Sequence, residues 1–450
     1  MTTPTPAAEL ERRTLRKIVR RFVPLLICCY FALYLDRLNV SVAALTMNAD
    51  LGISPAVFGL VAGAFFWTYS LLEVPSNWVV SKVGVRKWVT RIIISWGLVT
   101  MLTATAQGEV SLVLLRLLLG AAEAGFAPAM IVLVGKWFPA SKRAGAISLM
   151  VSAVLLSGFG TPLSATIMTG FDGLAGMAGW RWMFLVTGLP AVILGFVFYR
   201  VIRDDPREAT FLDDEEKAWL TARLAADAAA LGDADRHTFL RGLLNPRVGY
   251  LVVMYILFAF SLFGFQFFVP QMLQQFGLET SAIGWVAALP PLLALGPMLW
   301  WSRHSDRSGD RVRHYAAAAA VSGAGFLLAG FSMDRPLVAI VGFCIAGIGI
   351  YSCIPLQLAI PSTFLTGAAL AGGIGAINGL GNIGGYIGPQ VTGIIREATG
   401  NFTAAVFVLS GAITLAALMA VAFSFWTPAA ARRTEPVAAA PVPGGVLDPT

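Results

Sequence analysis

The residues of this sequence that could do chemistry are ionisable side chains placed inside apolar segments. A charge in the hydrocarbon core of a bilayer costs about 2.5–3.5 kcal/mol even on lenient scales, so it persists where it meets a partner, a water-filled cavity or a substrate. Such a group is therefore a functional candidate by default. Five of them lie well inside apolar runs: Asp36, Arg37, Glu73, Arg116 and Glu123.

These cations and acids together indicate anion binding linked to proton movement. Arginine stays protonated and offers a planar fork of donors that matches a carboxylate, so Arg37 is the predicted anion ligand. Asp36 and Glu123 are predicted to change protonation as an anion arrives, because protonation of a carboxylate frees Arg37 to hold that anion. A permanent structural ion pair between Asp36 and Arg37 is the alternative. For Arg116 and Glu73, structural roles are favoured.

Helical spacing places these groups with polar neighbours on single faces. Arg37 lies on a stripe with two tyrosines, whereas Asp36 is about 100° round the same helix and faces a neighbouring helix. One polar stripe on each of four helices indicates a central polar cavity. The stripes comprise Tyr30, Tyr34, Arg37 and Ser41; Tyr69, Glu73 and Asn77; Arg116 and Glu123; and Asn378 and Asn382, and Gln266 is a further polar group in the second half.

The composition identifies an integral membrane protein. Of 450 residues, 57% are hydrophobic and 13% charged, and the mean hydropathy is +0.74; a soluble domain is roughly 25% charged. Apolar runs predict twelve transmembrane helices in two sets of six, an all-α membrane protein. Phe65, Phe66 and Trp67 are expected to pack or to face lipid. The first run covers about residues 22–45, and the others start near Ala56, Trp88, Glu109, Ala144, Trp180, Val248, Ser281, Tyr315, Leu337, Ala369 and Phe402.

The distribution of Lys and Arg predicts the orientation. Cations precede the first run and fill the second-to-third and fourth-to-fifth connections, whereas residues 47–55, 107–109, 170–179 and 273–280 contain none. By the positive-inside rule both termini are cytoplasmic, in a cell inner membrane. The net charge of +7 follows from this asymmetry, so the predicted partner is the lipid bilayer and not nucleic acid. The basic N-terminus does not resemble a signal peptide.

A polar gap divides the chain into two halves. Asp213 and Glu216 in this gap form a capping-box pattern, which predicts a helix that ends at Gly232. The first eight residues and the tail are predicted to be disordered. The predicted order is a cytoplasmic segment 1–21, a six-helix bundle 22–200, a cytoplasmic linker 201–246, a second six-helix bundle 247–426 and a cytoplasmic tail 427–450.

The two halves share a loop pattern. Asn77-x-x-x-Ser81-Lys82-x-Gly84-x-Arg86 follows the second span, and Ser302-x-x-x-Asp306-Arg307-x-Gly309-x-Arg311 follows the eighth. Glycine permits a tight turn there, and the cations can hold helix carbonyls. Repeated helical units are a transporter architecture whose substrate site lies near the midplane between the units. The predicted structural or gating residues are Gly84, Arg86, Asp306, Arg307 and Gly309, in addition to Glu73 and Arg116.

Several strings resemble the anion:cation symporter family of the major facilitator superfamily, especially its tartrate transporter and phthalate permease branch. They include "YLDRLNVSVAALTMNADLGIS", "EVPSNWVVSKVGVRKW", "RLLLGAAEAGFAPAMIVLVGKWFPASKRAGA", "GWRWMFLVTGLPA" and "AIPSTFLTGAALAGGIGAINGLGNIGGYIGP". The resemblance implies the major facilitator fold of two pseudo-symmetric six-helix bundles. It implies that Arg37 contacts the substrate carboxylate, that Asp36 and Glu123 carry proton coupling, and that Tyr34, Tyr69 and Asn378 bind sugar acids.

These features predict a secondary active transporter that takes up a small organic anion with protons by alternating access, as a monomer. A sugar acid or a tartrate-like dicarboxylate is preferred. A phthalate-like aromatic acid is an alternative, because Gln357-Leu358 stands where the family often has an aromatic pair. A proton-driven exporter is another, although "SGFGTPLSA" lacks the Gly-Pro motif of drug antiporters. A solute sensor without transport also stays open.

Neither an enzyme nor a metalloprotein is predicted. The sequence contains no GxxxxGK[ST], HExxH or GxSxG string. The four cysteines lie in apolar spans and have no metal-like spacing to the histidines, which are expected in loops. No cofactor and no metal site are therefore predicted. These residues are Cys28, Cys29, Cys344 and Cys353, and His237, His304 and His314.

Overall fold

The computed structural model describes residues 6–151, 157–231 and 242–426, and these residues form helices and no strand. The first half comprises α1 (Pro6–Leu51), α2 (Pro55–Val83), α3 (Val85–Thr103), α4 (Glu109–Glu123), α5 (Phe126–Trp137), α6 (Ala140–Val151), α8 (Gly160–Gly170) and α9 (Gly179–Val201). The second comprises α12 (Pro246–Gln274), α13 (Thr280–Leu293), α14 (Leu295–Ser308), α15 (Arg311–Phe331), α16 (Pro336–Ala359), α17 (Gly367–Gly381), α18 (Ile383–Thr399) and α19 (Thr403–Trp426). Helix α10 (Asp214–Leu231) lies between the halves.

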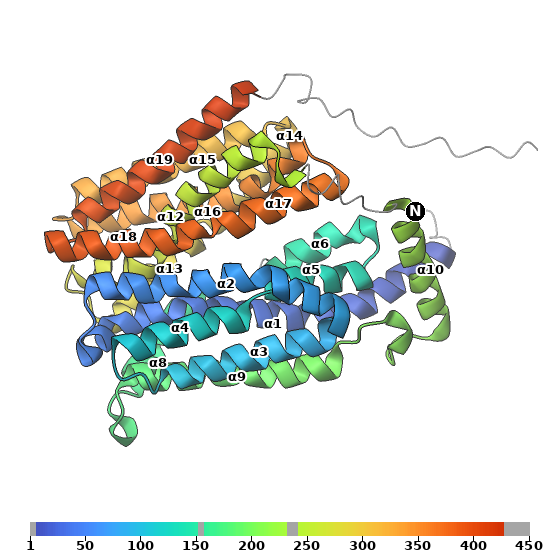
Figure 1. Cartoon of the computed structure of the whole chain (residues 1–450), viewed down its shortest axis with the longest axis horizontal. Coiled ribbons are helices and arrows are strands. Elements are labelled where there is room, and N and C mark those ends of the chain that lie inside the picture. The colour runs from blue at the N-terminus through green and yellow to red at the C-terminus, as the bar shows by residue number, and fades with distance from the viewer. Residues whose placement is uncertain (1–5, 152–156, 232–241, 427–450) are drawn as a thin grey trace, which may run out of the picture.

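The helices form two bundles that lie side by side (Figure 1). In the part of the chain that is described, nine helical segments are long and apolar enough to cross a membrane. The other three predicted spans do not meet this criterion of length and apolar composition, for physical reasons. Helix α3 carries Arg86, Lys87 and Arg91, whereas α6 and α8, and likewise α17 and α18, are short helices of 11 to 17 residues.

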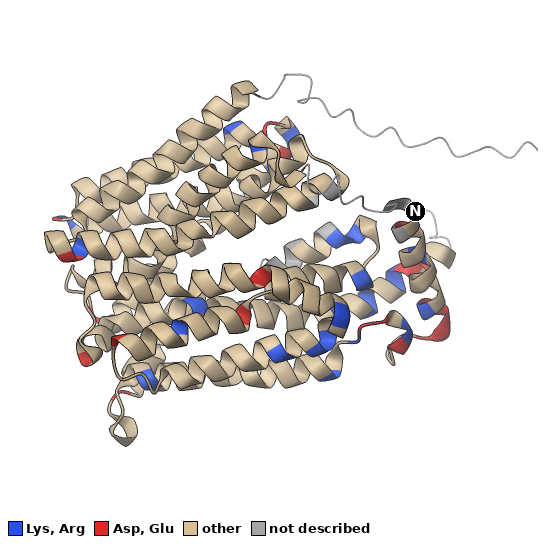
Figure 2. Cartoon of the chain, viewed as in Figure 1, with Lys and Arg blue, Asp and Glu red and all other residues tan. Residues whose placement is uncertain are grey.

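The bundles touch at one end of the molecule. We call this the closed end, and we call the end that carries the start of α1 and helix α10 the terminal end (Figure 1). Glycines bring the backbones together at the closed end, because a Cβ atom on Gly59 would meet Pro389 and one on Gly63 would meet Tyr386. Figure 2 shows that Lys and Arg gather at the terminal end, and that isolated charges occur inside the first bundle.

Helix α10 docks on the first turns of α1. The predicted capping box is confirmed: the Glu216 backbone N–H donates to Asp213 Oδ1 at 2.9 Å, and the Asp213 N–H donates to Glu216 Oε2 at 3.0 Å. Glu216 is fully buried, and it binds Arg13 at 2.9 Å and Lys17 at 2.7 Å. The backbone hydrogen bond from Glu216, with the nearby cations, holds the pKa of Asp213 below its ordinary value, so this contact is complete at neutral pH and weakens only in acid.

The prediction of disorder for the first eight residues is wrong for Pro6–Ala8, which belong to α1. Proline is favoured in the first turn of a helix, where its missing N–H has no partner to lose. The Glu9–Arg12 ion pair at 2.7 Å stabilises the following turn. Gly232, the predicted end of α10, and the tail 427–450 lie outside the described residues.

We expect the contact between α2 and α4 to tolerate no added bulk. A Cβ atom on Gly120 would overlap the Phe65 carbonyl oxygen and the Thr68 hydroxyl. Gly120→Ala should therefore destabilise the protein by about 1–3 kcal/mol, measured as a lower unfolding temperature of the purified protein. Gly135→Ala is the matched control, because nothing lies within 4 Å of its Cβ position. Equal stability of the two variants would contradict this account.

Candidate substrate site

Arg37 of α1 is held by side chains of two other helices, α2 and α4. Its Nε donates to Glu123 Oε2 of α4 at 3.0 Å. Its guanidinium lies over two rings of α2, 5.0 Å from the Phe65 centroid and 4.9 Å from the Tyr69 centroid. The Arg37 side chain is 17% exposed and that of Glu123 is not exposed at all. The cation is therefore the accessible member of the pair, and the acid is sealed behind it.

The break between α4 and α5 fixes the position of Glu123. Glu123 is the last residue of α4, and Gly125 has a φ of 87°, a conformation that suits glycine. The break frees the Ala124 carbonyl, which accepts a hydrogen bond from Ser76 Oγ at 2.7 Å. Trp88 Nε1 in turn donates to Ser76 Oγ at 2.8 Å. Helix α4 therefore ends at Glu123, and the Ser76 hydroxyl of α2 satisfies the Ala124 carbonyl that this helix end leaves free.

Asp36 faces away from the guanidinium of Arg37, as its helical position predicts. It is 4% exposed and accepts a hydrogen bond from Thr100 Oγ1 of α3 at 2.5 Å. Its carboxyl group also lies close to that of Glu123. In the described part of the chain the ion pair of Arg37 is with Glu123, and no ion pair joins Asp36 to Arg37. The structure therefore does not contain the alternative arrangement, an ion pair between Asp36 and Arg37.

Arg116 completes a buried group of two cations and two acids. It is 2% exposed, and its guanidinium lies 5.5 Å from the Phe65 centroid. Among the described residues, its Nε and Nη2 atoms have no hydrogen-bond partner, and neither have Asp36 Oδ2 and Glu123 Oε1. Unpaired polar atoms in a low-dielectric interior are costly. This group therefore retains capacity to accept a proton or a bridging molecule.

The second bundle contributes tyrosine and amide groups near the tyrosines of this site. Gln266 Nε2 donates to the Tyr351 hydroxyl at 3.3 Å. Tyr351 lies close enough to Tyr34 to interact with it, and Tyr255 is near enough to Arg37 for an electrostatic interaction. Tyrosines of both bundles therefore lie in the neighbourhood of the accessible cation.

Sequence reasoning missed the part that Tyr255 and Phe65 have in this site. Tyr255 lies in an apolar run of α12 without a charged neighbour, so no spacing pattern identified it. Phe65, expected only to pack or to face lipid, is 1% exposed and contacts both buried arginines. The signal available was its spacing to Tyr69, one helical turn further on in the sequence.

Other predicted site residues lie at different positions. The stripe on α1 is accessible only at its centre, because Tyr30 packs on Phe126 with ring centroids 5.3 Å apart and Ser41 donates to its own helix at Leu38. Glu73 is half-buried and makes no ion pair with another described residue. Two further residues of the second bundle are also half-buried and form no side-chain hydrogen bond within the described ranges: Asn378 and Asn382.

The matched loops form turns at the terminal end. Gly84 and Gly309 have φ values of 91° and 69°, the region that the turn prediction requires. Arg86 donates to the Tyr199 carbonyl at 2.8 Å. In the second half Asp306 lies 3.7 Å from Arg311, which donates to the end of α16. Arg307 is exposed.

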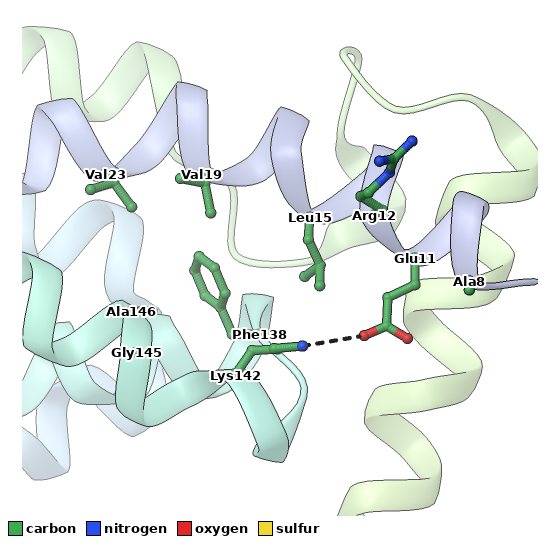
Figure 3. A pocket seen from close by; sticks show the side chains of 10 residues that line it. All are labelled: Ala8, Glu11, Arg12, Leu15, Val19, Val23, Phe138, Lys142, Gly145 and Ala146. Carbon is green, nitrogen blue, oxygen red and sulfur yellow. Dashed lines mark ion pairs between the residues drawn. The ribbon is translucent and has the colours of Figure 1, made fainter. Parts of the chain in front are cut away.

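Two features near the terminal end are separate from this site. The expectation that His304 and His314 lie in loops is wrong, because they belong to α14 and α15, where their ring nitrogens are 2.7 Å apart. A groove of about 550 Å³ between α1 and α6 is crossed by the Glu11–Lys142 ion pair at 3.9 Å (Figure 3). None of the predicted site residues lines it.

The fold and the buried charges are those of a transporter of two helical bundles, and comparison with known proteins gives the family. The model of the Major Facilitator Superfamily matches residues 26–389 and, in a second match, 251–444. The chain belongs to the Major Facilitator Superfamily. It is a multi-pass membrane transporter of the twelve-helix fold and not an enzyme.

Several relatives share most of this chain. A candidate tartrate transporter of Agrobacterium vitis is 41% identical over 423 residues, 94% of each chain. A quinolone resistance transporter of Acinetobacter baumannii is 36% identical over 407 residues, 89% of this chain and 93% of its own. The xylose transporter of E. coli, solved in a partially occluded inward-open conformation, has a TM-score of 0.70 at 13% identity and covers 90% of this chain and 97% of its own. That last likeness shows the fold alone.

Removal of the Thr100 hydroxyl should destabilise the buried charges. Thr100→Val leaves Asp36 Oδ1 without the hydroxyl that donates to it, and an unsatisfied buried acceptor costs about 1–3 kcal/mol. Thr103→Val is the matched control on the same helix, because Thr103 is also buried but donates only to the Val99 carbonyl of its own helix. A fall in unfolding temperature limited to Thr100→Val is the expected result. Equal falls would mean that the hydrogen bond to Asp36 contributes nothing.

Proposed function

We propose that this protein takes up a small organic anion together with protons, by alternating access of its two bundles. The observation that carries the proposal is the Arg37–Glu123 ion pair, whose cation is accessible among tyrosines while its acid is sealed. An anion that enters between the bundles meets Arg37 first. The accessible guanidinium can then exchange Glu123 for a substrate carboxylate.

Proton coupling follows from charge balance in the buried group. With both acids ionised, Asp36 and Glu123 balance Arg37 and Arg116, and an arriving anion would add an uncompensated charge. A proton on Glu123 removes its attraction for Arg37, which then binds the substrate carboxylate through its planar fork. Loss of the substrate restores the ion pair and favours release of the proton. Substrate and proton therefore move in the same direction.

Asp36 is the second proposed proton site. Its Oδ2 atom has no partner among the described residues, and its carboxyl group lies close to that of Glu123. A proton taken by one is therefore shared with or passed to the other, and the Thr100 hydroxyl holds Asp36 in place.

The surrounding groups favour a hydroxyl-bearing carboxylate. Tyrosines and amides can donate to and accept from hydroxyl groups, whereas an aromatic acid would leave them unpaired. The proposed substrate ligands are Arg37, Tyr34, Tyr69, Gln266, Asn378 and Asn382. A sugar acid or a tartrate-like dicarboxylate matches this set. The similarity to a candidate tartrate transporter of Agrobacterium vitis supports the same class.

The proposed orientation places the terminal end in the cytoplasm of a cell with the protein in its inner membrane. The gathering of Lys and Arg at that end supports it (Figure 2). The structure then corresponds to a state closed to the outside. We propose a monomer built of a segment 1–21, bundles 22–200 and 247–426, a linker 201–246 and a tail 427–450.

Proton-driven export is the second candidate function. The similarity to a quinolone resistance transporter, 36% identical over 407 residues, favours it. The accessible cation in the site, Arg37, favours an anion instead. Accumulation in energised vesicles of known orientation separates the two directions.

Thermal unfolding of the purified protein against a panel of carboxylates tests the proposed substrate class. A ligand at a hundred times its dissociation constant should stabilise the protein by about 2.7 kcal/mol. We expect a shift with one hydroxy acid that is lost in Arg37→Ala and weakened in Arg37→Lys, whose ammonium lacks the planar fork. Arg307→Ala, an exposed cation at the terminal end, is the control. No shift with any acid would contradict an anionic substrate.

Glu123→Gln tests proton coupling. An amide cannot release a proton, so the variant should lose accumulation driven by a pH gradient but keep substrate exchange, which requires no net proton movement. Both fluxes are measured with labelled substrate in proteoliposomes. Glu73→Gln is the control, since Glu73 makes no ion pair with another described residue. Gradient-driven accumulation by Glu123→Gln at the parental level would rule out Glu123 as the coupling acid.

A further inference from the structure

At the closed end, one carboxylate reaches from one bundle to the other. Glu397 lies in the last turn of α18 and is exposed. Its Oε2 atom accepts a hydrogen bond from Ser54 Oγ at 2.6 Å and another from the Ala56 backbone N–H at 2.9 Å. Ser54 is the N-cap of α2. A side chain of the second bundle therefore caps a helix of the first.

The charge of Glu397 suits α2 and not its own helix. The N-terminus of a helix carries partial positive charge and unpaired N–H groups, whereas the C-terminus carries partial negative charge. An acid in the last turn of α18 is at the unfavourable end of that helix. The same acid at the start of α2 is at the favourable end. The position of Glu397 in the sequence is thus explained by contact with the other bundle.

Few polar contacts join the bundles. Among the described residues, three side-chain hydrogen bonds cross between them: the two to Glu397 and one from Gln274 Nε2 to the Leu45 carbonyl at 3.1 Å. The backbones touch beside Glu397, because a Cβ atom on Gly393 would overlap the Pro55 carbonyl. Any separation of α18 from α2 therefore breaks both bonds of Glu397.

We propose that Glu397 is a positioning residue for transport, which latches the closed end through the N-terminus of α2. The bonds to Ser54 and Ala56 exist while this end is closed and are lost when it opens. Glu397 thereby sets the fraction of time for which the site is shut off from that side. The proposal rests on the alternating access proposed above but not on the orientation or the substrate.

A cysteine reporter tests the latch. Ala165 of α8 is fully buried and packs against Gly284 of α13 in the other bundle, so Ala165→Cys reacts with a bulky, charged maleimide only when the closed end opens. The reporter is placed in a chain whose Cys28, Cys29, Cys344 and Cys353 are replaced by alanine. Labelling rates are measured in nanodiscs, where the reagent reaches both faces.

We expect Glu397→Gln to be labelled about fivefold faster than the parent, which corresponds to the loss of one helix cap. Ser54→Ala should act in the same direction, and the double variant should add little to either change. Glu279→Gln is the matched control, because Glu279 also lies at the start of a helix of the closed end but makes no side-chain cap hydrogen bond. It should be labelled at the parental rate.

The variant Gly393→Val places a side chain between α18 and α2, where the backbones touch, and should force the closed end apart. It separates failure of the latch from failure of alternating access. If the reporter is labelled faster in Gly393→Val but at the parental rate in Glu397→Gln and Ser54→Ala, the latch proposal is wrong. Lower unfolding temperatures of the latter two variants would not change this conclusion. If no variant is labelled, the closed end does not open, and alternating access fails together with the latch. If Glu397→Gln is not recovered as folded protein, Ser54→Ala decides, because it keeps the carboxylate and removes one of its two donors.

Discussion

The ion pair between Arg37 and Glu123 determines much of what this chain must do to fold. A buried ionised carboxylate is costly without compensation, and removal of either partner of a buried ion pair leaves an uncompensated charge in a low-dielectric interior. The break at Gly125, the hydrogen bond from Ser76 to Ala124 and the packing of Gly120 on α2 all serve to place Glu123 beside Arg37. The structure of α2 and α4 can be understood as the means of bringing that acid to that cation.

Asp36 and Arg37 are neighbours in sequence but belong to different environments. Helical geometry separates their side chains by about 100°, so Arg37 faces the space between the bundles and Asp36 faces α3. Thr100 binds Asp36, and the aromatic rings of α2 support Arg37. One helix thus supplies an accessible cation and a sealed acid from adjacent residues. Arg116 balances the charge from α4.

Much of this arrangement could be predicted from the sequence because it depends on local rules. The lengths of the apolar runs predicted the membrane spans. Helical periodicity predicted that Asp36 and Arg37 face different neighbours. The pattern at Asp213 and Glu216 gave the start of α10. What could not be predicted depends on tertiary contact. Tyr255 has no charged neighbour in its helix, and Phe65 looks like any apolar residue until Arg37 is placed above it. Pro6–Ala8 carry no apolar periodicity, so no local pattern indicates that they belong to α1.

The glycine contacts at the closed end have a consequence for how the bundles separate. Where Gly59 meets Pro389 and Gly393 meets Pro55, backbone lies directly on backbone, with no flexible side chain between. Attraction between such surfaces falls steeply with distance, so a gap of less than 1 Å already forfeits about a quarter to a half of it. A long side chain could bend to follow a receding partner, but a peptide group cannot. Opening should therefore be abrupt, with two discrete populations and few molecules between them.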